Sequence, residues 1–317
     1  MAEIMIMGEL LVEIMRAKED VQLFETGEYF RGPFPSGAPG IFASTAARLG
    51  HSTGIISGVG NDDFGKNILD RLNQVGVDTR RVLVSDAAST GAAFVTYFAD
   101  GERKFIFHIN NTPAVMAKAP ETLEGLEDCK YFHIMGCSLM ASTAFGGEIL
   151  KTMRMLKANG AKVSFDPNVR LEMLRDPSAM DVVQEVYRNC SIFMPGRSEI
   201  RLITGEEDLD RAIAKAFADN PGLELIVLKS GSEGSKIYDR NGLAETMGVY
   251  KVTQLDPTGA GDSYDAGFIC GLAEGKSLKD AARIGAAAGA LNAAAFGPME
   301  GDISPATVAK MIQESEE

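Results

Sequence analysis

The chain has 317 residues, enough for one large or two modest domains with a sizeable core, which excludes a mini-protein. Hydrophobic residues make up 45% and charged residues 24% of it, a balance that excludes collagen, wholesale disorder and a membrane bundle. Its 31 Lys and Arg against 44 Asp and Glu give a formal net charge of -13, so we expect neither a nucleic-acid partner nor binding to an anionic membrane.

Several features predict a cytoplasmic protein. The 4 cysteines are far apart, without a Cys-x-x-Cys pair, and their apolar neighbours are typical of reduced core thiols. Three Glu interrupt the apolar stretch at the amino terminus and no basic leader precedes it, so we expect neither a signal peptide nor a membrane span there. The other long apolar region, 285–296, is short and Ala-rich, as expected of a buried helix.

Buried strands are predicted where short apolar runs are closed by Gly or Pro. In chain order these runs are 4–7, 54–59, 131–135, 162–165, 192–194 and 225–228. Helical spacing fills the intervals, for example behind the cap candidate Asp62 and before Asn159-Gly160. Such alternation predicts an α/β fold in which a parallel sheet carries helices on both faces.

One region breaks this rhythm, because 90–98 and 103–109 flank Asp100-Gly101 and are typical of a β-hairpin. Two strands are not stable alone in water, so we expect the hairpin to join strands from the amino-terminal part in a small sheet over one end of the main one. An edge extension of the main sheet is the alternative. We therefore expect a single domain over 1–317, with lid strands inserted from about 10–34 and 90–110.

The most informative segment is Asp256-Pro-Thr-Gly-Ala-Gly-Asp262, because this Gly-rich turn opens directly into a predicted helix. Free amides at a helix start, with a macrodipole of roughly +0.5 charge, suit a phosphate or a developing anion. Beside such a site, Asp262 can accept a proton from a hydroxyl as that hydroxyl attacks phosphorus. A helix-capping carboxylate is the alternative role for Asp262.

This segment resembles the carboxy-terminal signature of the ribokinase family, also called the PfkB carbohydrate kinases, and the resemblance continues through Asp265-Ala-Gly267. It implies a ribokinase-like three-layer sandwich with a mostly parallel central sheet and a small β-sheet lid. It also implies phosphoryl transfer from ATP with Mg²⁺. By this resemblance Asp262 is the catalytic base, and the backbone amides of Gly259, Ala260 and Gly261 form the anion hole.

Two segments near the amino terminus resemble the sugar-binding part of that family. The run Pro35-Ser-Gly37-Ala38-Pro39 is similar to its Gly-Gly region, although Ser36 replaces the first Gly and Ile41 replaces a frequent sugar-binding Asn. The resemblance makes Gly37 and Ala38 sugar contacts. Glu13 occupies the place where many of these kinases put an Asp on the sugar hydroxyls; an exposed lid charge is the alternative.

Two further segments follow strand ends, the edge at which open α/β sheets bind ligands. Asp166-Pro-Asn168-Val-Arg170 resembles the family's DPNxR motif, which implies that Asn168 and Arg170 contact the sugar or the transferring phosphoryl group. A surface salt bridge is the alternative for Arg170. Glu199 closes a segment similar to the family's NxxE motif and is expected to hold the magnesium hydration shell. Because Gly196 replaces the Asn of that motif, a helix-start carboxylate stays open.

The nucleotide contacts also follow from the resemblance. Lys229 to Gly234 lies between two predicted strands and is similar to the family loop that covers the nucleotide phosphates, with a hairpin turn as the alternative. This implies ATP contacts by Lys229, Gly231 and Gly234, because a lysine supplies charge that an acidic protein needs there. Thr258 in the signature and Asn292 on the adenine-side helix complete the set. The family leaves a monovalent cation open as a further cofactor.

The identity of the sugar depends on fewer residues. Kinases of 2-keto-3-deoxygluconate in this family usually carry an Arg on the lid strand where this chain has Asn110, which we take as a sugar contact. A neutral sugar is therefore favoured, although Arg170 or Arg103 can reach a carboxylate. The Gly8-Glu9 start looks most similar to tagatose-kinase-like ketohexose kinases.

These observations predict an ATP-dependent kinase of a small neutral sugar, a ketohexose such as tagatose or fructose. Pairing of two lid sheets would remove an open edge, so we expect a homodimer through the lid. The alternatives are a 2-keto-3-deoxygluconate kinase, a ribokinase or nucleoside kinase, and a sugar- or nucleotide-binding regulator without turnover. A dehydrogenase is more distant because the GxGxxG fingerprint is absent from the sequence.

Overall fold

The computed structural model describes residues 2–174 and 176–315. A large sheet forms its centre, from β1 (Ile4–Met7), β4 (Thr53–Gly60), β5 (Asp78–Ser85), β8 (Tyr131–Met135), β9 (Lys162–Asp166), β10 (Ile192–Phe193), β11 (Leu225–Lys229), β12 (Ser235–Asp239) and β13 (Gly242–Met247). Their spatial order is β13-β12-β11-β10-β9-β8-β1-β4-β5. The seven strands from β11 to β5 are parallel, and β12 and β13 add an antiparallel edge.

Each of the six predicted strands is present, and the mostly parallel sheet is confirmed. The apolar runs predict these strands well because the strands are buried on both faces, as β1, β4 and β8 are throughout. No apolar run marks β5 and β13 in the sequence. Both lie at the two edges of the sheet and keep most of their side chains at least partly exposed, so they lack an apolar run.

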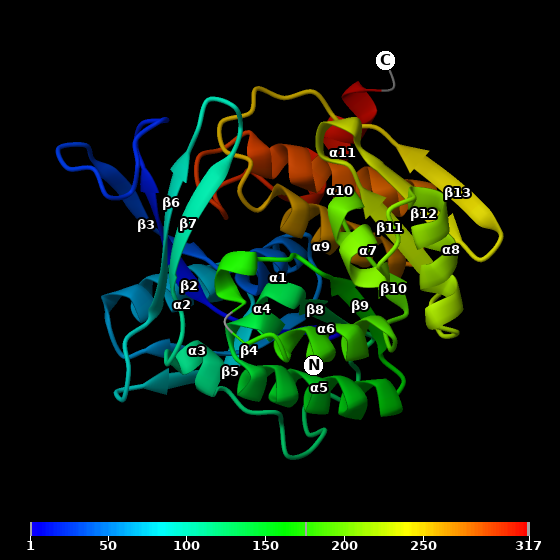
Figure 1. Ribbon diagram of the computed structural model, residues 1–317, viewed down its shortest axis with the longest axis horizontal. Coiled ribbons are helices and arrows are strands. Elements are labelled where there is room, and N and C mark those ends of the chain that lie inside the picture. The colour runs from blue at the N-terminus through cyan, green and yellow to red at the C-terminus, as the bar shows by residue number, and fades with distance from the viewer. Residues whose placement is uncertain (1, 175, 316–317) are drawn as a thin grey trace.

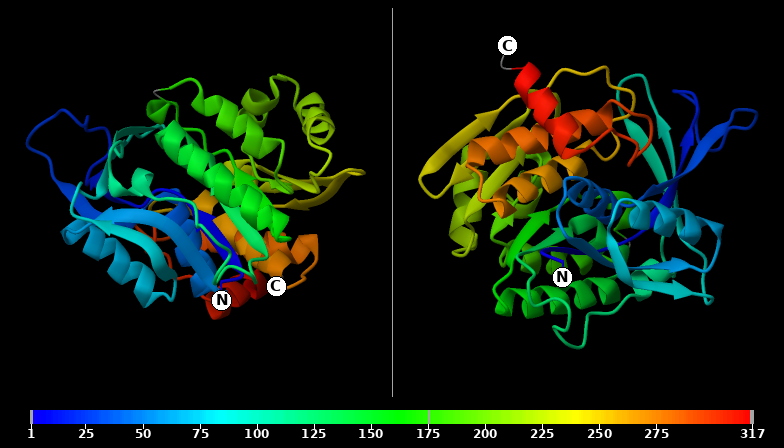
Figure 2. Two further views of the ribbon diagram at one scale, coloured as in Figure 1. Left: turned by 90° about the horizontal axis from the view of Figure 1, so that it is seen from below. Right: turned by 180° about the vertical axis from the view of Figure 1, so that it is seen from behind.

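Helices cover both faces of the sheet, as expected (Figures 1 and 2). They are α1 (Ala38–Arg48), α2 (Asp63–Gln74), α3 (Pro113–Met116), α4 (Gly136–Ala141), α5 (Thr143–Ala158), α6 (Ala179–Tyr187), α7 (Arg197–Thr204), α8 (Leu209–Asp219), α9 (Ala260–Ala273), α10 (Leu278–Ala293) and α11 (Pro305–Glu314). In Figure 2 the green α5 and α6 lie on one face, and the orange α9 and α10 on the other. Asp62 caps α2 as predicted, since its side chain accepts from the Gly65 amide.

The predicted hairpin forms a second sheet of its own, so the edge extension of the main sheet is wrong. This lid sheet contains β2 (Leu11–Arg16), β3 (Phe30–Ser36), β6 (Gly91–Tyr97) and β7 (Arg103–His108), in the order β3-β2-β6-β7. It stands beside the main body in Figure 1, where its strands are blue and cyan. Gly101 takes φ +87° in the tight turn between β6 and β7.

The core agrees with the predicted burial. All 4 cysteines are buried and free, and the middle of α10 packs closely on α9, where a Cβ at Gly267 would lie 2.9 Å from the Gly285 Cα. Within the described ranges, no helix is long and apolar enough to cross a membrane.

Candidate active site

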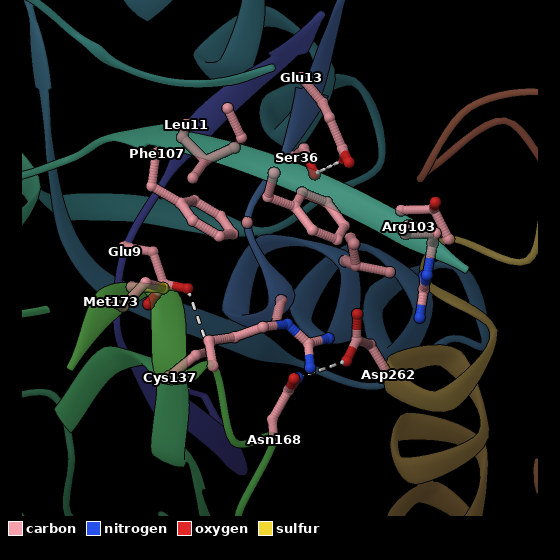
Figure 3. Close-up of a pocket in the computed structure, with 18 residues that line it drawn as sticks. Glu9, Leu11, Glu13, Ser36, Arg103, Phe107, Cys137, Asn168, Met173 and Asp262 are labelled. Carbon is pink, nitrogen blue, oxygen red and sulfur yellow. Dashed lines mark hydrogen bonds between the residues drawn. The ribbon is translucent and has the colours of Figure 1, made fainter. Parts of the chain in front are cut away.

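A pocket lies between the lid sheet and the carboxyl ends of the central strands. Glu9 follows β1, Cys137 follows β8, and Asn168 and Arg170 follow β9, while Asp262 enters from the first turn of α9. The chain reverses its direction of travel across the sheet at the neighbouring β1 and β8, and such a switch point leaves a crevice at the strand ends. The lid closes the other side of the pocket with side chains of β2 and β7 (Figure 3).

Asp262 has the surroundings of a general base. The residue is 9% exposed, and its carboxylate accepts a hydrogen bond of 3.2 Å from Nδ2 of Asn168. Burial, assisted by the negative charge of Asp166, raises the pKa of Asp262 to about 7, although Lys229 and Arg170 oppose that shift. The N-cap position of α9 belongs to Gly259, so Asp262 is not the capping residue. A carboxylate with this pKa is suited to accept a proton near neutral pH.

The turn that opens α9, residues 256–262, is the anion-binding turn expected from the sequence. Gly259 takes φ +80°, and a Cβ there would lie 2.8 Å from the Pro298 carbonyl oxygen, so this position needs glycine. The N–H groups of Gly259, Gly261 and Asp262 have no acceptor in the part of the chain that the structure describes, whereas Ala260 donates to the Pro257 carbonyl at 3.3 Å. Of the three expected amides, Gly259 and Gly261 are thus available to an anion.

The pocket also contains two buried glutamates (Figure 3). Glu13 is 3% exposed and accepts a hydrogen bond of 2.8 Å from the Ser36 hydroxyl, so it is not an exposed lid charge. Burial raises the pKa of Glu13 to about 7, and the charge of Asp256 adds to that shift. Glu9 accepts hydrogen bonds from Cys137 and Ser138, and burial raises its pKa as well.

Glu9 was missed as a site residue, although one signal was present. It lies two residues after the end of the first buried strand, at the edge of the sheet where ligands bind. Arg103 was considered only as a contact to a carboxylate, and it lines the pocket from β7. Four residues expected to contact the sugar or the phosphoryl group line this pocket, namely Gly37, Ala38, Asn168 and Arg170, and so does Thr258, which was expected to contact ATP.

Glu13→Gln is expected to stabilise the ligand-free protein at alkaline pH. Because the folded-state pKa of Glu13 is raised from 4.5 to about 7, its contribution to stability is complete below about pH 4.5 and is lost as the pH rises through 7. The glutamine stays neutral, so thermal unfolding at pH 8 should show a gain on the order of 2 kcal/mol. At pH 4.5 we expect little difference. The exposed lid variant Glu102→Gln serves as control, and an equal gain at both pH values would contradict the assignment.

Lys229, which was expected to contact the ATP phosphates, has two carboxylate partners in this structure. Its Nζ lies 2.7 Å from Asp166 Oδ2 and 2.8 Å from Asp265 Oδ2, and its side chain is only 17% exposed. Although burial opposes ionisation, Lys229 holds the pKa of Asp166 below its usual range. Burial, together with the neighbouring Asp166, raises the pKa of Asp265 well above its usual range. The lysine charge is thus engaged by a buried ion pair that ties the ends of β9 and β11 to α9.

The other predicted nucleotide contacts lie outside the pocket lining. Gly231 and Gly234 form the turn between the antiparallel β11 and β12, with φ +55° and +87°, so a hairpin turn describes this loop. Asn292 is 1% exposed and donates 2.7 Å to the Thr258 carbonyl oxygen, which places it beneath the anion-binding turn and not on an open adenine wall. A role of Gly231 and Gly234 in ATP binding stays a prediction.

The structure also shows where Glu199 and Asn110 lie. Glu199 accepts hydrogen bonds of 2.7 Å from the Gly196 amide and 2.8 Å from the Val169 amide, so its carboxylate caps the start of α7 and also supports the DPNxR segment. Among the described residues, no group of three His, Cys, Asp or Glu side chains could hold a metal. Asn110 lines a second cavity beside Thr90 and Thr112, and is absent from the lining described above.

Comparisons with known proteins identify the family of this chain. The family model described as pfkB family carbohydrate kinase matches residues 1–305. A rice (Oryza sativa subsp. japonica) protein named Fructokinase-1 is 28% identical over 96% of this chain and 96% of its own length. Probable fructokinase-7 of Arabidopsis thaliana is 30% identical over 86% of this chain and 79% of its own length.

The fold has a solved counterpart as well. The crystal structure of a putative Ribokinase II from E. coli, in complex with ATP and Mg²⁺, is similar with a TM-score of 0.91 and 37% identity, over 99% of this chain and 100% of that one. The ribokinase-like fold predicted from the sequence is thereby confirmed. From the match over residues 1–305, the chain belongs to the pfkB family of carbohydrate kinases, which are phosphotransferases.

Proposed function

We propose that the protein is an ATP-dependent ketohexose kinase and that fructose is the first acceptor to test. The observation that carries this proposal is the buried Asp262 carboxylate, with a pKa raised to about 7, in the same turn as the available amides of Gly259 and Gly261. Relatives named fructokinases support the choice of sugar. A pocket with acceptors at Glu9, Glu13 and Asp262 suits a molecule that offers several hydroxyl donors.

Each residue has a defined part in this proposal. Asp262 accepts the proton of the reacting hydroxyl, while Asn168 holds the carboxylate in place by its 3.2 Å hydrogen bond. The amides of Gly259 and Gly261 stabilise negative charge that develops during transfer, because their N–H groups are already oriented. Arg170 lines the same pocket and offers a guanidinium to phosphoryl oxygens. The lid strands keep water from the sugar.

The anion-binding turn fits a nucleotide phosphate. A Cβ on Gly261 would meet nothing within 4 Å, so there is open space over the first turn of α9 for a phosphoryl group. ATP supplies the transferable group, and Mg²⁺ neutralises its charge while being bound mainly by phosphates and water. We keep Glu199 as the carboxylate for the magnesium hydration shell. A monovalent cation stays a prediction.

A second candidate is a kinase of a sugar acid such as 2-keto-3-deoxygluconate. The observation that favours it is Arg103, which lines the pocket from the lid strand β7, while Arg170 lines the same pocket from the segment after β9. Two guanidinium groups can bind a carboxylate in the acceptor. This weakens the argument from Asn110, because a cation reaches the pocket from β7, whereas Asn110 lies beyond the end of that strand.

A substrate panel separates these candidates. We expect ADP release with Mg-ATP to be fastest with fructose or tagatose in a coupled assay, and slower with ribose, nucleosides and 2-keto-3-deoxygluconate. Fastest turnover with the sugar acid would favour the second candidate. Turnover with none of these acceptors, despite ATP binding by calorimetry, would contradict the proposed function and favour a sugar- or nucleotide-binding regulator.

We also propose a cytoplasmic homodimer that forms through the lid. β3 and β7 are the outer strands of the lid sheet, and Phe30 and Ile106 on them are 40% and 44% exposed. Edges of this kind favour pairing with a second copy. A single monomeric species at micromolar concentration in sedimentation velocity would contradict the dimer.

A further inference from the structure

The lid touches the anion-binding turn through one tyrosine. Tyr97 is the last residue of β6, and its hydroxyl donates 2.9 Å to Oδ1 of Asp256, which lies 159 residues further along the chain. The same hydroxyl contacts Oγ1 of Thr258. Asp256 and Thr258 belong to the segment that leads into Gly259, so a lid strand is hydrogen-bonded to the start of α9.

The donors and acceptors among Tyr97, Asp256 and Thr258 follow from the protons that each side chain carries. A phenol has one proton, and a carboxylate only accepts, so the Tyr97 proton goes to Asp256. The hydroxyl of Thr258 must then donate to the Tyr97 oxygen. Burial and the negative charge of Asp256 raise the pKa of Tyr97, which keeps it protonated and able to donate. The arrangement is a short chain from Thr258 through Tyr97 to Asp256.

Asp256 is the point at which the turn is anchored. It is 1% exposed, its Oδ1 also accepts 2.9 Å from the Thr258 amide, and its Oδ2 accepts 3.0 Å from the Gly297 amide. On the other side, Asn292 donates 2.7 Å to the Thr258 carbonyl oxygen. Helix α10 and the segment after it therefore hold this turn from the main body, and Tyr97 holds it from the lid.

The strand that carries Tyr97 is also part of the sugar pocket. Along β6, Ala93 lines the pocket and is in register with Glu13 of β2. Tyr97 itself is in register with Arg103 of β7, which lines the pocket too. A displacement of the lid sheet would therefore move sugar-side groups and the Tyr97 hydroxyl together.

We propose that Tyr97 is a positioning residue that couples the lid to the anion-binding turn, so that the amides of Gly259 and Gly261 are correctly placed only while the lid is seated. This inference rests on the proposed function for its kinetic consequence. The structural coupling itself does not require that function. Loss of the hydroxyl should then impair stabilisation of the transferring group more than it impairs binding of the sugar.

Tyr97→Phe tests this inference, since it removes one hydroxyl and keeps the ring. Two controls remove a lid hydroxyl that does not reach the turn. Tyr29→Phe makes the same change at a lid tyrosine that is 82% exposed. Thr96→Val removes a hydroxyl that donates 2.6 Å to the Val21 carbonyl oxygen within the lid, and so reports the effect of weakening the lid alone.

The first readout is hydrogen–deuterium exchange of the ligand-free protein, which needs no turnover. We expect peptides that cover residues 255–262 to exchange at least about threefold faster in Tyr97→Phe and to be unchanged in both controls. The second readout is kinetic. With the best sugar, kcat should fall about tenfold, as for loss of a hydrogen bond to a charged acceptor, while the KM for the sugar changes less than about twofold.

A double-mutant cycle completes the test. In a Thr258→Val background, Tyr97→Phe should lower kcat much less than it does in the wild type. The reason is that Thr258→Val has already removed part of the same hydrogen-bond chain. Three outcomes would each overturn the coupling. They are unchanged hydrogen–deuterium exchange of residues 255–262 in Tyr97→Phe, an equally large effect of Thr96→Val, and additive effects of Tyr97→Phe and Thr258→Val on kcat. If no sugar is phosphorylated by the wild type, the proposed function fails, and the exchange experiment still decides whether Tyr97 holds the turn.

Discussion

Asp262→Asn is expected to lower kcat roughly a hundred- to ten-thousandfold, the usual contribution of a general base. The amide has nearly the same shape, and its oxygen can still accept the hydrogen bond from Asn168, but it cannot take the proton of the sugar hydroxyl. Sugar and ATP binding should persist, so titration calorimetry with each ligand separates the loss of chemistry from the loss of the site. The coupled ADP assay measures the kinetic effect.

The dependence of kcat on pH is an independent test of Asp262 as the general base. Because burial raises the pKa of Asp262 to about 7, kcat of the wild type should fall as the pH decreases below 7, approaching tenfold per unit. Asp63→Asn is the matched control, since Asp63 is an exposed acidic residue in the first turn of α2. A kcat of Asp262→Asn within a few-fold of wild type would show that another group takes the proton.

Lys229→Met is expected to cause the largest loss of stability, about 3–5 kcal/mol, because it leaves Asp166 as a buried charge without its cation. Although burial opposes its ionisation, Lys229 holds the pKa of Asp166 below its usual range, whereas burial raises the pKa of Asp265, so we expect loss of the lysine to act mainly through Asp166. Urea denaturation at pH 7 measures the effect. Activity should also fall, because the lysine ties the strand ends of the pocket to α9.

Two further variants test that explanation. Lys66→Met removes one side of an ion pair with Asp70 on the exposed face of α2, and should change stability by less than about 1 kcal/mol. Adding Asp166→Asn to Lys229→Met removes the stranded charge and should recover part of the lost stability. If Lys66→Met and Lys229→Met lowered the free energy of unfolding equally, the buried ion pair would not be the main cause of the loss. The same would follow if the double variant recovered no stability.

Local patterns predicted much of the architecture. The apolar runs identified the strands that are buried on both faces, because a strand surrounded by helices has to be apolar on every side chain. The edge strands β5 and β13 escaped for the same reason, since exposed edges place no such demand on the sequence. The turn that opens α9 was identifiable because a helix start with Gly259 and Gly261 is a local property.

The chain path decided which side chains meet. Glu13 could be an exposed lid charge or a pocket residue, and only the placement of β2 beside β3 gave it Ser36 as a partner. Lys229 was assigned to phosphate, but Asp166 and Asp265 converge on it from distant segments. Asn110 and Arg103 border the same hairpin, and the fold turns Arg103 into the pocket and Asn110 towards another cavity.

The sequence alone thus determined the fold class, the order of the buried strands along the chain and the turn that carries Asp262, because backbone conformation and burial leave periodic, local traces. The tertiary structure alone decided the partners of the charged groups and the contact of Tyr97 with Asp256. Such pairs depend on how strands far apart in the chain are ordered in space. No local sequence pattern predicts the order of the strands in space. That order decides which charged groups are neighbours, and so it sets the pKa values of the site.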